Sequence, residues 1–158
     1  VIHLNGRLDI ACHVSPQSSL RWLSSLPRMG LNLQLDPSLY HVQYFGRGPD
    51  ENYPDRNSAS ELGVYETTPS KMGYLKYVYP VENGSRSDCE WIAFRHDDGT
   101  GLCISGHGQK FSCSALLYSA TELNDAKHTC DLSKREDGRD TIHVNLDHQL
   151  MGIGGDTR

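Results

Sequence analysis

The sequence predicts an all-β protein, an antiparallel sandwich or barrel of about seven or eight short strands. Three observations support this fold class: apolar and polar residues alternate along much of the chain, turn residues separate the alternating runs, and helical periodicity is nearly absent. A period of two places every second side chain on the same face of a strand, so one face is buried and the other is solvated. The predicted strands cover residues 2–4, 8–14, 31–35, 40–44, 89–95, 102–105, 111–118 and 142–146.

Turn residues mark where these strands connect. Residues 5–6 (Asn-Gly) form the strongest two-residue hairpin signal, and they predict a hairpin between the first two strands. Residues 36–38 (Asp-Pro-Ser) and 97–99 (Asp-Asp-Gly) predict two more turns. The helical candidate is residues 122–127, one or two turns long, with Thr121 placed to cap it.

Length and charge limit the classes of protein to which the chain can belong. With 158 residues it is expected to form one domain, residues 1–158, and to bury about 70% of the surface of the unfolded chain. It carries 15 Lys and Arg against 20 Asp and Glu, a net charge of −5, with the cations scattered. This argues against nucleic-acid binding, which needs a clustered basic face. No apolar run approaches the ~18 residues of a membrane span, which argues against a membrane protein.

The cysteines predict reduced, structural thiols. Their number is odd, their spacing is irregular and no Cys-x-x-Cys pair is present, so a zinc site or a thioredoxin-type redox site is not expected. Three of them, Cys12, Cys89 and Cys113, lie in alternating apolar runs, where a free cysteine packs as a small apolar residue. Disulfides are rare in the cytosol, so unpaired thiols indicate a cytoplasmic protein. The five cysteines are Cys12, Cys89, Cys103, Cys113 and Cys130.

The alternation lapses between residues 45 and 79, and this part of the chain begins with a polar stretch rich in glycine and proline at 46–56. A loop of this length in a compact domain is functional or packed against itself. In one interpretation its two arginines anchor the carboxylates of Glu51 and Asp55 in a charge-paired loop. In the other, the polar surface faces a sugar or a partner domain. The residues assigned to this structural loop are Arg47, Glu51, Asn52, Asp55 and Arg56.

Two further segments depart from the strand pattern. Residues 80–86 place a carboxylate, an amide and a guanidinium around a tight turn. Asn83 in this turn begins an N-glycosylation sequon, which we interpret as a turn alone. Residues 151–156 are too rich in glycine to form a strand, and no helix follows them to bind a phosphate.

Known catalytic motifs are absent from the sequence. It contains no nucleophile elbow, no phosphate-binding loop and no His-Glu-x-x-His motif. His143, Asp147 and His148 are close in sequence, but in a strand His148 points away from the face that the other two share. We therefore expect no metal site on this chain. Carboxylates are plentiful, but an acid/base pair needs a geometry that sequence alone does not show.

Three segments, GRGPDENYPDR at 46–56, PVENG at 80–84 and MGIGGD at 151–156, resemble the C-terminal β-sandwich of the glycoside hydrolase family 2 β-galactosidases. LPRMG at 26–30 resembles the strand entry that precedes the first loop in that family. The resemblance runs from about residue 5 to residue 156. It implies a galactose-mutarotase-like fold, an antiparallel supersandwich in which large sheets stack face to face, here incomplete at both ends.

The resemblance also implies where the chemistry lies. The family's two catalytic glutamates and its Mg and Na ions belong to a separate (β/α)8 barrel that has no counterpart here, so this chain is expected to hold no catalytic residue and no cofactor. The family continues its Gly-Gly-Asp segment into a Trp beneath the sugar, whereas Thr157 and Arg158 follow Asp156 here. The candidates for contact with substrate are Glu82, Asn83, Gly155 and Asp156.

Two functions remain open. In the first, the chain is part of a β-galactosidase that hydrolyses terminal β-D-galactosides in carbohydrate metabolism. It supports the catalytic barrel, and its partners are a β-galactoside and the barrel domain or another protein chain. In the second, it is a stand-alone lectin-like carbohydrate-binding or interaction module without hydrolase activity. Its sugar-stacking faces would then be Tyr53, Tyr74, Tyr77 and Tyr79, although packing within the sheets also explains these tyrosines.

Overall fold

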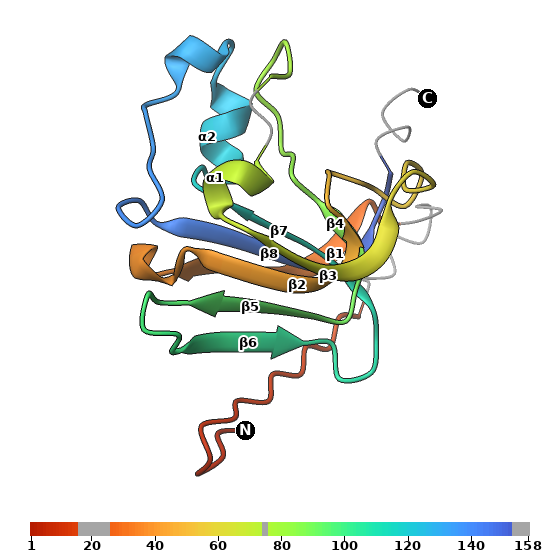
Figure 1. Cartoon of the computed structure of the whole chain (residues 1–158). Helices are drawn as coiled ribbons and strands as arrows, with labels where there is room; N and C mark the ends of the chain where they lie inside the picture. The colour runs from red at the N-terminus through yellow and green to blue at the C-terminus, as the bar shows by residue number, and fades with distance from the viewer. Residues whose placement is uncertain (16–25, 74–75, 153–158) are drawn as a thin grey trace.

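The computed structural model describes residues 1–15, 26–73 and 76–152, and it consists mainly of two four-stranded antiparallel sheets (Figure 1). The strands are β1 (Arg28–Leu35), β2 (His41–Gly48), β3 (Glu61–Thr67), β4 (Arg86–Cys89), β5 (Trp91–Arg95), β6 (Gly101–Ser105), β7 (Phe111–Leu116) and β8 (Ile142–Leu150). The short helices are η2 (Pro37–Leu39), α1 (Pro69–Met72), α2 (Ala120–Asp125) and η3 (Thr129–Asp131). One sheet has the order β1-β8-β7-β4 and the other has the order β3-β2-β5-β6. The predicted all-β antiparallel sandwich is confirmed.

The two sheets share one hydrophobic core, which explains the alternation in the sequence. Along β2, Val42 and Tyr44 are buried in this core, whereas Gln43 and Phe45 between and after them point outward and are only half-buried. β8 contributes Ile142 and Val144 in the same way, and Leu146 packs against the core beside them. The buried residues of the core are Val42, Tyr44, Met72, Cys89, Ile92, Phe94, Cys113, Ala115, Ile142 and Val144.

The predicted N-terminal hairpin is confirmed only at its turn. Gly6 adopts a φ of 83°, and the turn brings Ile2 and Leu8 together in a single antiparallel bridge. The strand predicted for residues 8–14 is wrong, because these residues form no ladder and their apolar side chains are exposed. Alternation produces a strand only where a neighbouring strand supplies hydrogen bonds, and no strand among the described residues pairs with this segment.

β3 and α1 lie where the alternation lapses, and the sequence did not predict them. β3 pairs with β2 so that Tyr65 lies opposite Tyr44, with ring centroids 5.5 Å apart. On the other face of β3, Leu62 and Val64 are exposed. Because both faces of this strand carry apolar residues, and Gly63 interrupts the inner face, the alternation that identifies other strands is missing here.

Helix α2 begins two residues before the predicted helix. Ser119 caps it in place of Thr121: the Ser119 hydroxyl accepts a hydrogen bond from the backbone N–H of Glu122 at 3.2 Å. In return, the Glu122 carboxylate accepts one from the backbone N–H of Ser119 at 2.9 Å. This capping box satisfies two backbone amides at once, which a cap at Thr121 without a partner three residues on would not do.

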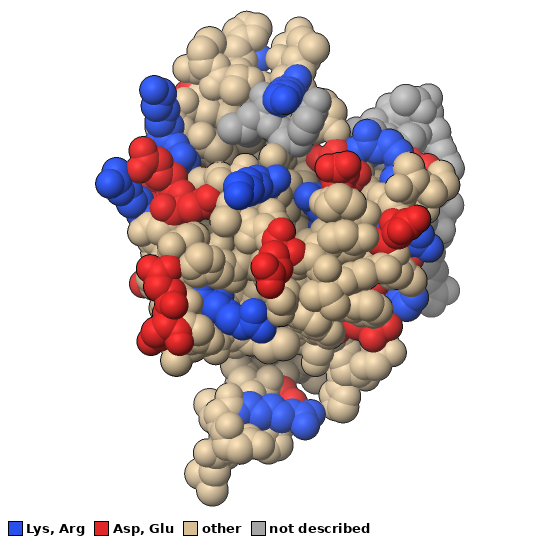
Figure 2. Space-filling view, viewed as in Figure 1, with Lys and Arg blue, Asp and Glu red and all other residues tan. Residues whose placement is uncertain are grey.

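Charged side chains are mixed over the face of the molecule shown in Figure 2. Lys and Arg side chains lie beside Asp and Glu in small groups, with uncharged surface between the groups. This face therefore has no basic patch of the kind that binds nucleic acid. Within the described residues, no helix is both long enough and apolar enough to cross a bilayer.

Candidate functional site

The three segments that depart from the strand pattern lie against one another in the structure. The backbone N–H of Asn52 donates to the carbonyl of Ser85 at 2.9 Å, and that of Gly84 donates to the Glu51 carboxylate at 2.6 Å. Residue 152, where the described part of the third segment ends, lies so close to Asp55 that a Cβ on Gly152 would overlap the Asp55 carboxylate. We call residues 46–56 and 80–88 together the polar junction.

Asn52 connects the two halves of the polar junction. Its side chain is completely buried. The amide nitrogen donates to the carbonyls of Arg47 and Asp50, both at 2.9 Å. The amide oxygen accepts from the backbone N–H of Ser87 at 2.9 Å and from its hydroxyl at 2.6 Å. Both donors and both acceptor positions of the amide are therefore used, so this side chain fixes the loop against β4.

Arg86 is a buried cation on the other side of the junction, a role the sequence did not reveal. Its Nε donates to the hydroxyl of Tyr44 at 3.1 Å and to the carbonyl of Pro49 at 3.0 Å. Its Nη1 donates to the carbonyls of Gly84 and Ser85 at 3.0 and 3.2 Å. Burial raises the pKa of Tyr44 to about 12, against the lowering effect of Arg86, so this phenol stays protonated at neutral pH. The guanidinium thus holds two turns of the backbone together.

Glu51 is the acidic centre of the loop. Its side chain is 11% exposed, and it accepts hydrogen bonds from the hydroxyl of Tyr77 and from Nη2 of Arg56, the latter at 2.5 Å. Burial, followed by the hydrogen bond to Glu51, raises the pKa of Tyr77. The expected anchoring of Glu51 by Arg56 is therefore confirmed, and this part of the loop is paired internally.

Replacing Arg56 by alanine is expected to lower the free energy of unfolding by about 1–2 kcal/mol. This value lies between the cost of losing an exposed ion pair and the cost of losing a buried one. Glu51 loses its cation but keeps its bonds to Tyr77 and Gly84, and Arg56 itself is 53% exposed. Urea unfolding of the chain measures the change. Arg139→Ala is the matched control, because the pair between Arg139 and Glu136 is largely exposed. If Arg56→Ala and Arg139→Ala lower the free energy of unfolding equally, Arg56 has no special structural role.

The expectation that Arg47 also anchors the carboxylates of its own loop is wrong. Its Nε donates to Asp88 in β4 at 2.6 Å, and its Nη1 donates to the carbonyl of Ser60 at 2.9 Å. Arg47 points outward from β2, as strand geometry requires at this position, and β4 is the partner it reaches there. Arg47 therefore fixes the start of the loop to β4 and to the residue before β3.

Arg28 bridges two carboxylates that lie far apart in the sequence. Its Nε and Nη2 donate to the two oxygens of Asp147 at 2.6 and 2.8 Å, and its Nη1 donates to Glu82 at 2.6 Å. Asp147 is only 4% exposed at its side chain, and burial raises its pKa in spite of Arg28. Burial lowers the pKa of Arg28, but the hydrogen bonds that Arg28 donates to both carboxylates raise this pKa overall. One guanidinium thus joins β1, β8 and the polar junction.

A row of amides continues this cluster across the sheet. Asn145 donates to Glu82 at 3.1 Å and to the hydroxyl of Ser114 at 3.0 Å, and it accepts from Asn32 at 2.7 Å. The sequence analysis did not single out this row. Its signal is nevertheless present, because Asn145 and Asp147 occupy the strand face opposite the buried Val144.

Of the candidates for substrate contact, two can be located. Glu82 pairs with Arg28, and Asn83 is buried, with its amide donating to the carbonyl of Val81 at 2.8 Å. Such a buried asparagine is not open to glycosylation, which agrees with the interpretation of its sequon as a turn. Gly155 and Asp156 lie outside the described residues. The role of these four residues in binding sugar stays a prediction.

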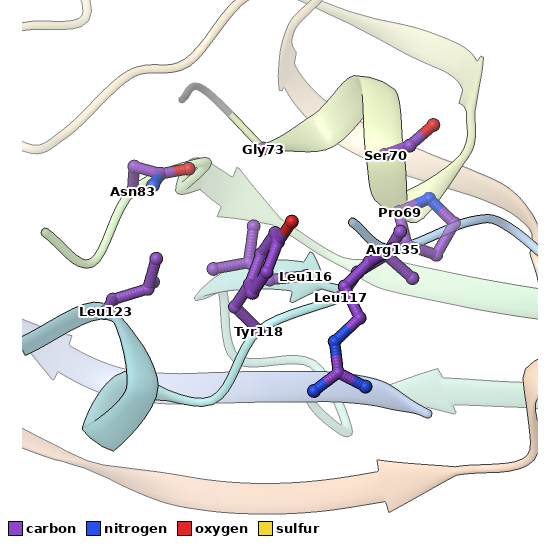
Figure 3. A pocket seen from close by; sticks show the side chains of 9 residues that line it. All are labelled: Pro69, Ser70, Gly73, Asn83, Leu116, Leu117, Tyr118, Leu123 and Arg135. Atoms are coloured by element: carbon purple, nitrogen blue, oxygen red, sulfur yellow. The ribbon is translucent and has the colours of Figure 1, made fainter. Parts of the chain in front are cut away.

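Asn83 also borders a small cavity between α1, α2 and the end of β7 (Figure 3). Its volume is about 70 Å³, far below the ~300 Å³ of ordinary ligand sites. Apolar side chains form much of its wall, and the guanidinium of Arg135 lies on the side opposite Asn83 (Figure 3). Its lining residues are Pro69, Ser70, Gly73, Asn83, Leu116, Leu117, Tyr118, Leu123 and Arg135. The cavity has room for water but not for a sugar ring.

The tyrosines proposed as stacking faces differ in their surroundings. Tyr53 is buried, Tyr77 is half-buried and bonded to Glu51, and Tyr74 lies outside the described residues. Tyr79 is 64% exposed, with its ring stacked near that of His128 at 6.3 Å between centroids. Packing therefore accounts for Tyr53 and Tyr77, and only Tyr79 of the located three offers an open face.

All five cysteines carry free thiols. Cys89 and Cys113 are buried in the core as expected, with their sulfurs 3.4 Å apart, whereas Cys12 is exposed because the strand expected around it does not form. The hydrogen bond between Cys113 and Cys89, together with burial, raises the pKa of Cys113 well above its usual value. Buried thiols with little thiolate react slowly.

Thiol titration of the isolated chain is therefore expected to give two values. Without denaturant, a disulfide reagent should count only the three exposed thiols, Cys12, Cys103 and Cys130. In denaturant without reductant it should count all five. A count of three in denaturant would instead show that two cysteines are joined in a disulfide.

Comparison with known proteins gives a consistent result. The whole chain, residues 1–158, matches the family model described as "Beta galactosidase small chain". A β-galactosidase of Pseudoalteromonas haloplanktis is 39% identical over 135 residues, and one of Vibrio cholerae serotype O1 is 40% identical over 134 residues. Each alignment covers 85% of this chain and 12% of the relative. A β-galactosidase of Photobacterium profundum is 33% identical over 157 residues, or 98% of this chain and 13% of the relative.

The chain thus spans about an eighth of the length of the curated relatives it matches. The match to the family model extends over all of its residues, including the polar junction and the Arg28 cluster. The sandwich described above therefore belongs to the β-galactosidase small-chain family.

Proposed function

We propose that this chain is the supporting sandwich of a β-galactosidase, an enzyme that hydrolyses terminal β-D-galactosides, and that the catalytic carboxylates lie in another part of that enzyme. The names of the relatives and the small share of their length that the chain covers support this proposal. A cytoplasmic location, expected from the unpaired thiols, is part of the same proposal.

One observation carries the assignment of a supporting role: three carboxylates of the site, those of Glu51, Glu82 and Asp147, are already paired with cations of the same chain. A retaining glycosidase needs two carboxyl groups about 5–5.5 Å apart on either side of the scissile bond. Here Glu82 and Asp147 bind one guanidinium, that of Arg28, and therefore lie around a cation and not around a substrate. Such an arrangement stabilises the sandwich against which a catalytic domain can rest.

No three His, Cys, Asp or Glu side chains within residues 1–15, 26–73 and 76–152 lie together in a way that could hold a metal ion. We assign the Mg and Na ions that the resemblance implies to the proposed catalytic part of the enzyme.

Hydrolysis of a chromogenic β-galactoside tests the proposal. The purified chain, shown to be folded by its β-rich circular dichroism, is expected to give no turnover. Activity should require the remainder of the β-galactosidase. Turnover that follows the isolated chain through purification and disappears in Glu51→Gln or Glu82→Gln would overturn the supporting role and place an acid/base pair in the polar junction.

The alternative, a carbohydrate-binding module, has one observation in its favour. An open groove of about 570 Å³ lies between η2, the turn from β5 to β6 and Gly138, which is wide enough for a monosaccharide. Tyr40 and Asp97 in this groove are joined by a hydrogen bond of 2.7 Å, and His96 and Asp98 add further polar groups. Calorimetric titration with galactose, compared with Tyr40→Ala, would detect this function.

A further inference from the structure

The outer face of the sheet β3-β2-β5-β6 carries a row of apolar side chains that nothing in the described structure covers. Val64 of β3 lies directly opposite Phe45 of β2, and Phe45 lies directly opposite Trp91 of β5. All three occupy outward positions, since their strand neighbours point into the core. Leu62, two residues before Val64, extends the row along the edge strand, and Cys103 of β6 lies beside it. We call Leu62, Val64, Phe45 and Trp91 the outer row.

Exposure of the outer row is high for apolar side chains. Val64 is 58% exposed and Leu62 is 47% exposed, while Phe45 and Trp91 are half-buried. Single exposed apolar residues are common on protein surfaces, but a contiguous group across three strands marks an interaction surface.

Polar groups around the outer row are already satisfied within the chain. On one side, Gln43 donates to Glu66 at 2.9 Å and accepts from Arg95 at 3.1 Å. On the other side, Arg47 pairs with Asp88. An apolar centre with a hydrogen-bonded polar rim is the usual organisation of a protein–protein interface.

The other sheet shows that an uncovered outer face is not a general property of this sandwich. On the outward side of β8, Asn145 and Asp147 are 6% and 3% exposed, because Arg28 and Glu82 cover them. That face is polar and closed by the chain itself. The outer row is apolar, and residues 1–15, 26–73 and 76–152 leave it open.

We propose that the outer row is the surface through which this sandwich docks on the remainder of a β-galactosidase polypeptide. This inference rests on the proposed function. The relatives carry the sandwich as 12–13% of one much longer chain, so most of that chain is available to cover the row. Tethering gives such a partner an effective concentration on the order of millimolar, which favours it over a second, free copy. The complementary surface is an apolar patch of the same polypeptide.

The alkylation rate of Cys103 tests this contact without any substitution. It is exposed in the sandwich and points outward beside the row, whereas Cys130 in η3 is an exposed thiol of a separate element. The intact β-galactosidase that contains this chain is treated with iodoacetamide, and the alkylated cysteines are mapped by mass spectrometry. Cys103 is expected to react at least ~100-fold more slowly in the native enzyme than after unfolding, because it reacts only when the contact opens. Reaction of native Cys103 within a few-fold of its unfolded rate would overturn the proposal.

Two substitutions in the intact enzyme test the occupant of the surface. Val64→Asp places a charge in the outer row and is expected to accelerate alkylation of Cys103 at least ~10-fold. Val78→Asp is the matched control, since Val78 is 82% exposed and lies outside the row, and it should leave the rate unchanged. Equal rates for both variants would contradict the proposal.

The remaining outcomes are also decisive. If protection of Cys103 disappears when the enzyme is diluted to folded monomers, a second copy covers the row and the proposal is wrong. If Cys103 is accessible in an enzyme that hydrolyses β-galactosides, the docking surface fails while the proposed function stands. If the intact protein does not hydrolyse β-galactosides, the proposed function is wrong, and the docking proposal that rests on it is wrong as well.

Discussion

Replacing Arg28 by alanine is expected to lower the free energy of unfolding by about 3–5 kcal/mol, the cost of leaving a buried carboxylate without its cation. Asp147 loses two hydrogen bonds in a position where its side chain is 4% exposed, and Glu82 loses its ion pair. Urea unfolding followed by tryptophan fluorescence measures the change. Arg28→Lys should be intermediate, because an ammonium keeps the charge but does not reproduce the bidentate geometry.

The loss of stability in Arg28→Ala should also depend on pH in a defined direction. Burial raises the pKa of Asp147, and Arg28 opposes this rise, so removing Arg28 raises the pKa further. A carboxyl group with a raised pKa binds protons more tightly in the folded than in the unfolded state. The stability of Arg28→Ala therefore falls as pH increases between the unfolded and folded pKa values.

The difference in the free energy of unfolding between the wild type and Arg28→Ala is accordingly expected to be smaller at pH ~5 than at pH ~7.5. Adding Asp147→Asn to Arg28→Ala should recover part of the stability and remove this pH dependence. A deficit that is the same at both pH values in Arg28→Ala would show that Asp147 is not the group left unpaired.

Asn52→Asp is expected to cost at least about 3 kcal/mol, although the two side chains have nearly the same shape. The amide nitrogen of Asn52 donates to two backbone carbonyls, those of Arg47 and Asp50. A carboxylate oxygen in its place would face both carbonyl oxygens in a site with no solvent exposure. Protonation of the new carboxyl restores one donor, so the cost should decrease toward acid pH.

Thermal and urea unfolding of the same chain test this prediction. Asn124→Asp is the matched control, because Asn124 is exposed on α2 and its substitution should change stability by no more than ~0.5 kcal/mol. If Asn52→Asp behaves like this control, the amide is not what holds loop 46–56 against β4.

The period-two pattern predicted most strands because it reflects a single physical requirement, a buried inner face. β2, β5, β7 and β8 each alternate around the shared core, and their approximate positions were predicted. The pattern failed where this requirement does not apply. Residues 8–14 alternate without a partner strand, and β3 is apolar on both faces because its outward side chains belong to the outer row.

The polar site was harder to predict, because polar side chains pair with groups that are close in space and not necessarily close in sequence. Loop 46–56 was identified from its composition, and its pair between Arg56 and Glu51 was expected because both residues lie in one loop. Arg47 was assigned to the same loop but reaches Asp88 instead. The Arg28 cluster joins residues from opposite ends of the chain, so only the pairing of β1 with β8 brings it together.

The pairing of β1 with β8 determines the order in which the chain can fold as it leaves the ribosome. Among the strands that the structure describes, β1 lies at the edge of its sheet and has β8 as its only neighbour. Even their nearest partners, Leu35 and Ile142, are separated by roughly a hundred residues, or about 5–20 s of translation. All strands of the other sheet emerge between residues 41 and 105 and can assemble during that interval. Premature termination before residue 142 would leave β1 without its neighbour, and nascent β1 is therefore the segment on which a chaperone has the longest opportunity to act.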